Sequence, residues 1–159
     1  WVPSLFVRKK NNTIEVVLSG RGIVQVLKGM GLLIGDKIKQ GVRLPDWVMG
    51  SKLYVTAALR GMFDTDGSVY LDKHNYRDRR LYLSICVAFT SYSPVLLHDI
   101  KISLNTLGFH PTNSTKNRIT LRRRQEVIRF FDTINPRNPK HIVRFTHFVG
   151  EVKCYKVRV

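Results

Sequence analysis

Two aspartates one residue apart follow an apolar run with the spacing of a helix. Residues 59–67 read Leu-Arg-Gly-Met-Phe-Asp-Thr-Asp-Gly, which places Asp64 and Asp66 at the end of that run. Carboxylates bind divalent cations such as Mg²⁺, and a bound cation can activate water for attack on a phosphate. The purely structural alternative, without a metal, is a polar turn that ends a helix. An EF-hand calcium loop is excluded, because Val69 and Asn75 stand where it needs glycine and glutamate.

The chain is strongly basic, which bears on how the aspartate pair is interpreted. Its 159 residues include 27 Lys and Arg against 11 Asp and Glu, for a formal net charge of +16, and 43% are hydrophobic. A folded domain with this charge is typical of proteins that bind a polyanion, nucleic acid first of all. Because paired carboxylates repel nucleic acid unless a metal ion lies between them, we expect a metal-dependent enzyme acting on phosphates. A ribosome-associated basic protein remains an alternative.

Cysteine usage and apolar run lengths indicate the compartment. Cys86 and Cys154 are far apart and form no zinc-binding or disulfide pattern, so we expect reduced thiols and an intracellular protein, cytoplasmic or organellar. No apolar run approaches the length of a membrane helix, and we expect no membrane partner. Residues 1–3 lack both an initiating Met and the layout of a signal peptide, so we expect a fragment or a processed product.

Hydrophobic periodicity predicts an α+β fold with a partly repeated unit. The predicted elements are strands at 5–9 and 14–18, a helix at 21–30, a helix from Ser51 into the aspartate pair, strands at 68–71 and 80–90, a helix from Ser93-Pro94 to Gly108, a hairpin around 109–111 and 118–122, and a helix at 124–133. A basic, aromatic segment broken by two Asn-Pro pairs ends the chain. We therefore expect a partial upstream repeat with a linker over 1–50 and an αββαββα unit over 51–159.

The strand over 80–90 alternates strictly between apolar and polar or small residues, so one sheet face is predicted to be buried and the other to face nucleic acid. Arginine reads guanine edges, and Ser, Thr and Tyr contact bases or phosphates. The expected DNA-binding residues on this face are Arg80, Tyr82, Ser84, Arg118, Thr120 and Arg122. Lys73 and Lys116 are expected to contact phosphates, as are His74, Arg77 and Arg79. For any one of them, a solvated strand face without a ligand is the alternative.

The segment over 59–67 resembles the signature of the LAGLIDADG homing endonucleases. Leu59, Gly61, Asp64, Asp66 and Gly67 match it, and the four other positions are substituted. Two flanking segments, 44–48 and 138–141, also resemble the connection before the second motif and the C-terminal segment of two-repeat members. The chain is thus similar to the second-motif half of such a member, with part of the first repeat.

This resemblance implies an αββαββα unit whose antiparallel, saddle-shaped sheet binds DNA. It also implies that motif helices pack in pairs on small residues, here Gly61, Ala57 and Ala58. Asp66 is then the catalytic residue and a metal ligand, and Thr65 contributes its carbonyl as a second ligand. The implied cofactor is Mg²⁺, for which Ca²⁺ or Mn²⁺ can substitute. Asp64 is expected to be structural, bonding backbone amides or a basic neighbour.

The function implied is a site-specific, metal-dependent DNA endonuclease that makes double-strand breaks in double-stranded DNA and serves intron or intein mobility. One motif supplies half of an active site. A homodimer, or a complementary LAGLIDADG half from another segment, is therefore expected to supply the rest. The alternatives are a cleavage-inactive DNA-binding protein and an RNA-splicing maturase on the same fold.

Overall fold

The chain forms two compact units in a computed structural model, which describes residues 2–11, 13–36, 39–75 and 81–154. The units are Trp1–Gln40 and Gly41–Val159. The boundary therefore precedes residues 41–50, which were expected to link the partial repeat to the second unit. That residues 1–40 are a partial upstream repeat stays a prediction.

The first unit contains a hairpin and a helix, in the order that the sequence predicts. Its elements are β1 (Ser4–Arg8), the 3₁₀ segment η1 (Lys9–Asn11), β2 (Thr13–Val17) and α1 (Arg21–Gly29). The two strands pair in antiparallel register, from Ser4 opposite Val17 to Arg8 opposite Thr13. Most apolar side chains of this unit stay exposed, so its core is small.

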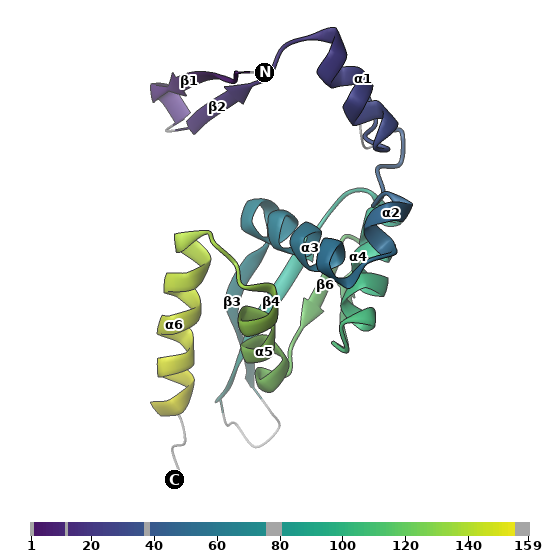
Figure 1. Ribbon diagram of the computed structural model, residues 1–159. Coiled ribbons are helices and arrows are strands. Elements are labelled where there is room, and N and C mark those ends of the chain that lie inside the picture. The colour runs from purple at the N-terminus through teal and green to yellow at the C-terminus, as the bar shows by residue number, and fades with distance from the viewer. Residues whose placement is uncertain (1, 12, 37–38, 76–80, 155–159) are drawn as a thin grey trace. The chain divides into compact units, whose positions relative to one another are not determined.

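The second unit builds one antiparallel sheet with helices packed against it (Figure 1). Its elements are α2 (Asp46–Met49), α3 (Lys52–Asp66), β3 (Ser68–Asn75), β4 (Leu81–Thr90), α4 (Pro94–Thr106), β5 (Thr112–Thr115), β6 (Arg118–Leu121), α5 (Arg124–Ile134) and α6 (Pro139–Cys154). The strand order is β3-β4-β6-β5. The predicted α+β class and element order are confirmed, while the first hairpin strand lies at 112–115 rather than 109–111.

Aromatic side chains dominate the core between the sheet and the helices. Phe63 of α3 is fully buried, and its ring centroid lies 4.9 Å from that of Phe130 and 5.6 Å from that of Phe89. Both distances suit edge-on or tilted aromatic pairs, which add to the stabilisation from apolar burial. Ile85 and Val87 of β4 complete this core from the sheet. The alternation in β4 therefore directs its apolar side chains inward, as predicted.

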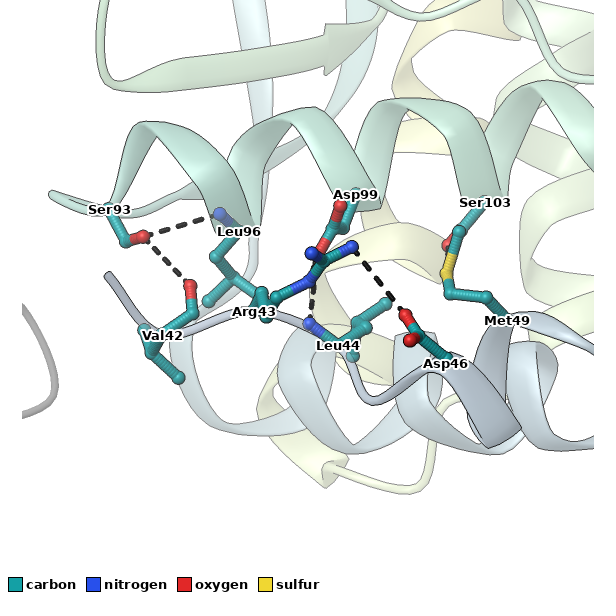
Figure 2. A network of polar contacts seen from close by, with 9 residues as sticks. All are labelled: Val42, Arg43, Leu44, Asp46, Met49, Ser93, Leu96, Asp99 and Ser103. Atoms are coloured by element: carbon teal, nitrogen blue, oxygen red, sulfur yellow. Dashed lines mark hydrogen bonds and ion pairs between the residues drawn. The ribbon is translucent and has the colours of Figure 1, made fainter. Parts of the chain in front are cut away.

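The segment 41–50 belongs to the second unit because polar contacts tie it to α4 (Figure 2). The Ser93 hydroxyl donates to the Val42 carbonyl at 2.9 Å, and the Leu44 amide donates to the buried Asp99 carboxylate at 2.9 Å. A buried carboxylate is costly unless it is hydrogen-bonded, so these contacts hold the segment in place. Part of the predicted linker thus runs against α4, and the short helix α2 follows it.

Helix α6 is the main element that the sequence prediction missed. The Asn-Pro pairs of its segment predict irregular structure, but Pro139 occupies the first turn, where the missing N–H costs nothing. The Asn138 side chain accepts the Lys140 amide at 3.0 Å and so caps the helix. Phe145 of α6 stacks on Phe131 of α5 with 3.8 Å between ring centroids. Tertiary packing therefore stabilises a helix whose start resembles a break.

Two glycines fulfil strict conformational demands at helix ends. Gly108 has φ of +79° and follows α4 where the sequence predicts its end. Gly67 follows α3, and a Cβ there would lie 2.3 Å from Phe63 Cδ2 and 2.5 Å from the Phe63 carbonyl oxygen. Only glycine therefore lets β3 leave α3 so close to the buried Phe63.

Candidate functional site

The two aspartates at the end of α3 have different environments. The Asp64 carboxylate accepts the backbone amides of Arg137 at 3.0 Å and Asn138 at 3.1 Å. The Asp64 carbonyl also accepts the Asn138 side-chain amide at 2.7 Å. Asp64 thus joins the end of α3 to the start of α6, which confirms its expected structural role.

Asp66 is exposed and is the last residue of α3. Its carboxylate receives a hydrogen bond from the Thr65 hydroxyl at 3.3 Å. A helix C-terminus leaves its last carbonyls without intrahelical partners and carries a partial negative charge. A carboxylate at this end opposes the helix dipole, so Asp66 lowers stability unless a cation lies near it. This end of α3 is therefore suited to cation binding.

A small cavity of about 60 Å³ adjoins Asp66. It is lined by Met62 of α3, by Thr90 and Ser91 at the end of β4, and by residues of α4. Thr90 and Ser91 therefore line the same cavity as Asp66. The polar end of α3 and the end of β4 thus meet beside the apolar core.

The described residues of one chain supply only part of a metal site. Among them, no group of three or more His, Cys, Asp or Glu side chains could hold a metal ion together. Asp66 and the carbonyl of Thr65 match the oxygen ligands that Mg²⁺ takes while keeping several waters. The donors therefore fit half of a magnesium site, and the metal-binding roles of Asp66 and Thr65 stay predictions.

One side of α3 is exposed and carries small or apolar residues at a spacing of four. Leu53 is 74% exposed, Ala57 and Gly61 are exposed, and Ala58 beside them is half-buried. A Cβ placed on Gly61 would meet nothing within 4 Å. We call Leu53, Ala57 and Gly61 the small-residue face of α3. Nothing in the described part of the unit requires glycine at position 61, and packing of a second helix on this face stays a prediction.

The register of the sheet brings the predicted DNA-facing positions to one face. Ser84 lies opposite Asp72 of β3, and Thr90 lies opposite Arg118 of β6. Residues at every second position share a face, so Ser84, Arg118, Thr120 and Arg122 all lie on the side away from the core. Arg80 and the side chain of Tyr82 lie outside the described residues, as do Arg77, Arg79 and the side chain of His74.

Side chains on this polar face bind one another. Arg122 forms an ion pair with Asp72 and reaches Ser114 Oγ at 3.5 Å. Burial tends to lower the pKa of Arg122, but the Asp72 carboxylate outweighs it and raises that pKa. The Arg118 guanidinium lies 6.0 Å from the centre of the Tyr70 ring. Both arginines are therefore held in place on the face expected to meet DNA.

Two small residues on the same face are covered by their neighbours. Thr120 is 1% exposed, and its hydroxyl lies 2.6 Å from Ser114 Oγ. A DNA contact by Thr120, as expected from its position, would require Ser114 to release that hydroxyl. Cys86 is also buried, and burial raises the pKa of its thiol to about 11, so the thiol stays protonated at neutral pH.

Two of the predicted phosphate contacts, Lys73 and Lys116, lie apart from this face. Lys73 is exposed near the end of β3, at a position whose strand neighbours Val69 and Leu71 turn toward the core. Lys116 is exposed in the turn between β5 and β6. Both are accessible, and their phosphate contacts stay predictions.

Asn138 is a hydrogen-bond donor to Asp64 that the sequence analysis did not identify. The available signal was an Asn followed by Pro139, a common pattern of a helix cap with proline in the first turn. The contact joins residues 74 positions apart, so the partner could not be identified from local sequence.

Comparison with known proteins shows that this site lies in a region that matches a known domain family. A model of the LAGLIDADG-like domain family matches residues 54–135, from α3 to the end of α5. The tRNA-splicing ligase RtcB of Pyrococcus furiosus is 32% identical over a region covering 42% of this chain and 8% of that protein. The chain thus matches only a small part of that relative. The solved group I intron-encoded homing endonuclease I-CeuI, complexed with DNA, aligns with a TM-score of 0.46 and 12% identity, covering 86% of this chain and 75% of that one.

Proposed function

The chain belongs to the LAGLIDADG-like domain family, and on that premise we propose that it is a site-specific DNA endonuclease of the homing type. It hydrolyses phosphodiester bonds in both strands of double-stranded DNA and depends on Mg²⁺. The observation that carries this proposal is the contrast at the end of α3. Asp64 is hydrogen-bonded to the backbone before α6, whereas Asp66 stays exposed where a carboxylate costs stability.

The Asp66 carboxylate and the Thr65 carbonyl would hold the metal, together with ligands from a second motif helix. When bound, Mg²⁺ would supply Lewis-acid chemistry that favours attack by water and offsets charge on the phosphate, and Ca²⁺ or Mn²⁺ would suit the same oxygen ligands. Asp66 supplies the charge that retains the cation. The C-terminal end of α3 adds to the negative potential there.

The second half of the site comes from another α3-like helix. The small-residue face supports this part of the proposal, because Gly61 leaves room for a close helix approach and exposed Leu53 gains from burial. Two copies of this chain would form an isologous pair and favour a palindromic DNA site. A complementary half from another segment would give an asymmetric site instead.

DNA binds on the polar face of the sheet in this proposal. Arg118 and Arg122 present guanidinium groups there, and Ser84 adds a hydroxyl. Guanidinium groups bind phosphates and guanine edges in two-point contacts. We therefore expect an affinity that falls steeply with salt, as phosphate contacts release counterions.

The test compares Asp66→Asn with the wild-type chain for cleavage of a randomised DNA library in Mg²⁺ and for DNA affinity. The variant should lose cleavage and keep wild-type or higher affinity, because it removes a repulsive charge and a metal ligand together. Asp132→Asn, at an exposed position of α5, is the matched control and should cleave normally. Unchanged cleavage by Asp66→Asn would show that the mechanism is wrong. Binding without cleavage by the wild type would favour the DNA-binding alternative. Mass measurement in solution gives the stoichiometry.

A further inference from the structure

A basic cleft of about 240 Å³ lies between α4 and the β5–β6 hairpin. His98 and Lys101 line it from α4, and Lys116 and Arg118 line it from the hairpin. None of the residues that line this cleft is acidic. Lys101 and Lys116 therefore bring two positive charges to one opening, while the guanidinium of Arg118 lies near Tyr70 on the polar face of the sheet.

The cleft is built from two elements that are joined to each other. Pro94, His98 and Lys101 are spaced to lie on one face of α4. The Ser91 amide, just before α4, donates to the Asn117 carbonyl in the hairpin turn at 3.1 Å. This bond holds the turn against the start of α4, so the basic side chains from the two elements remain close together.

The lining suits a phosphate with its attached sugar. Lysine and arginine side chains are donors without acceptor capacity, which matches the oxygens of a phosphodiester. Asn113 and Thr115 add an amide and a hydroxyl, and the buried side chains of Leu97 and Ile119 provide an apolar floor. A free inorganic anion would make no use of that floor, whereas a ribose or deoxyribose ring would.

The position of the cleft relates it to Asp66. Thr90 and Arg118 are directly opposite each other in the β4–β6 register. Thr90 lines the small cavity beside Asp66, and Arg118 lines the basic cleft, so one residue of each opening is a cross-strand neighbour of the other. A nucleic acid strand that passes Asp66 could therefore place a neighbouring phosphate in the cleft.

We propose that this cleft, between α4 and the β5–β6 hairpin, is a second binding site for the sugar–phosphate backbone of DNA, and that it holds the backbone beside the cleaved position. The proposal rests on the proposed function in one respect, since it takes DNA as the ligand. His98 and Lys101 become nucleic-acid contacts that the strand pattern could not reveal. Their role is to hold and position the backbone rather than to take part in hydrolysis.

The experiment measures how the affinity for a duplex of random sequence depends on salt, for Lys101→Gln and for the double variant with Lys116→Gln. Each phosphate contact contributes about 0.9 to the slope of log affinity against log salt. We expect the slope to fall by about 0.9 in the single variant and about 1.8 in the double variant. Lys140→Gln removes an exposed charge from α6, outside the cleft, and is expected to keep the wild-type slope. Circular dichroism checks that each variant is folded.

The outcomes separate this inference from the proposed endonuclease activity. Reduced slopes confined to the cleft variants support the cleft, even if Asp66→Asn shows that the mechanism of cleavage is wrong. Wild-type slopes in the cleft variants, or an equal fall in Lys140→Gln, overturn it while leaving cleavage untouched. A wild-type chain that binds no duplex also overturns it. A parallel titration with inorganic phosphate tests whether the cleft prefers the DNA backbone to a free anion. If inorganic phosphate displaces the duplex from the wild-type chain and from the cleft variants equally well, the cleft has no preference for the backbone.

Discussion

Asp64→Ala should destabilise the fold, whereas Asp66→Ala at the same helix end should not. Asp64→Ala removes the acceptor of two backbone amides, those of Arg137 and Asn138 at 3.0 and 3.1 Å. Hydrogen bonds to a charged acceptor contribute about 1.5–3 kcal/mol each, and partial exposure favours the low end. Two such bonds at the low end give about 3 kcal/mol, and relief of the α3 dipole offsets about 0.3–1 kcal/mol of this, so we expect a loss of about 2–3 kcal/mol of unfolding free energy.

Asp66→Ala is the matched comparison at the same helix end. It removes a carboxylate that opposes the α3 dipole, which is unfavourable by about 0.3–1 kcal/mol. Its stability should therefore be unchanged or slightly raised. Relief of the dipole is common to both variants, so the difference between them reports the hydrogen bonds of Asp64.

Urea unfolding in a Trp1→Phe background measures both variants, because Trp47 is then the only tryptophan and lies in the second unit. The unfolding free energy of Asp64→Asn should lie between those of Asp64→Ala and the wild type, since the amide retains one acceptor oxygen. Equal midpoints and slopes for the two alanine variants would refute the reasoning that Asp64 joins α3 to α6.

Three further perturbations test other contacts. Gly67→Ala should destabilise by about 1–3 kcal/mol in thermal unfolding, because its Cβ would overlap Phe63, and wild-type stability would contradict that close approach. Gly61→Ala should stabilise a single chain by about 0.5–1 kcal/mol yet weaken association in sedimentation experiments, and unchanged association would argue against pairing through α3. Burial lowers the pKa of His141, with Lys140 adding to that shift, so the unfolded chain protonates first as pH falls through 6.5 and stability declines there. His141→Leu should flatten this decline in unfolding free energy measured between pH 8 and pH 5, and an unchanged slope would assign it to other groups.

Local sequence determined most of the second unit's elements. The alternation over 80–90 marks β4 and its buried face, because side chains of a strand point alternately to its two sides. Ser93 and Pro94 mark the start of α4, since a capping hydroxyl and a proline suit the first turn of any helix. The motif over 59–67 likewise sufficed to place an acidic end on α3 and to indicate its family.

Only the tertiary structure decided how those residues are used. Asp64 and Asp66 are chemically identical in the sequence, and they differ because the chain returns 73 residues later to offer backbone amides to Asp64 alone. Thr120 has the strand position of a DNA contact, yet Ser114 covers its hydroxyl. The basic cleft brings α4 beside a hairpin turn that follows it in the chain. Each of these outcomes depends on contacts between distant segments, which the periodicity of a single segment does not contain.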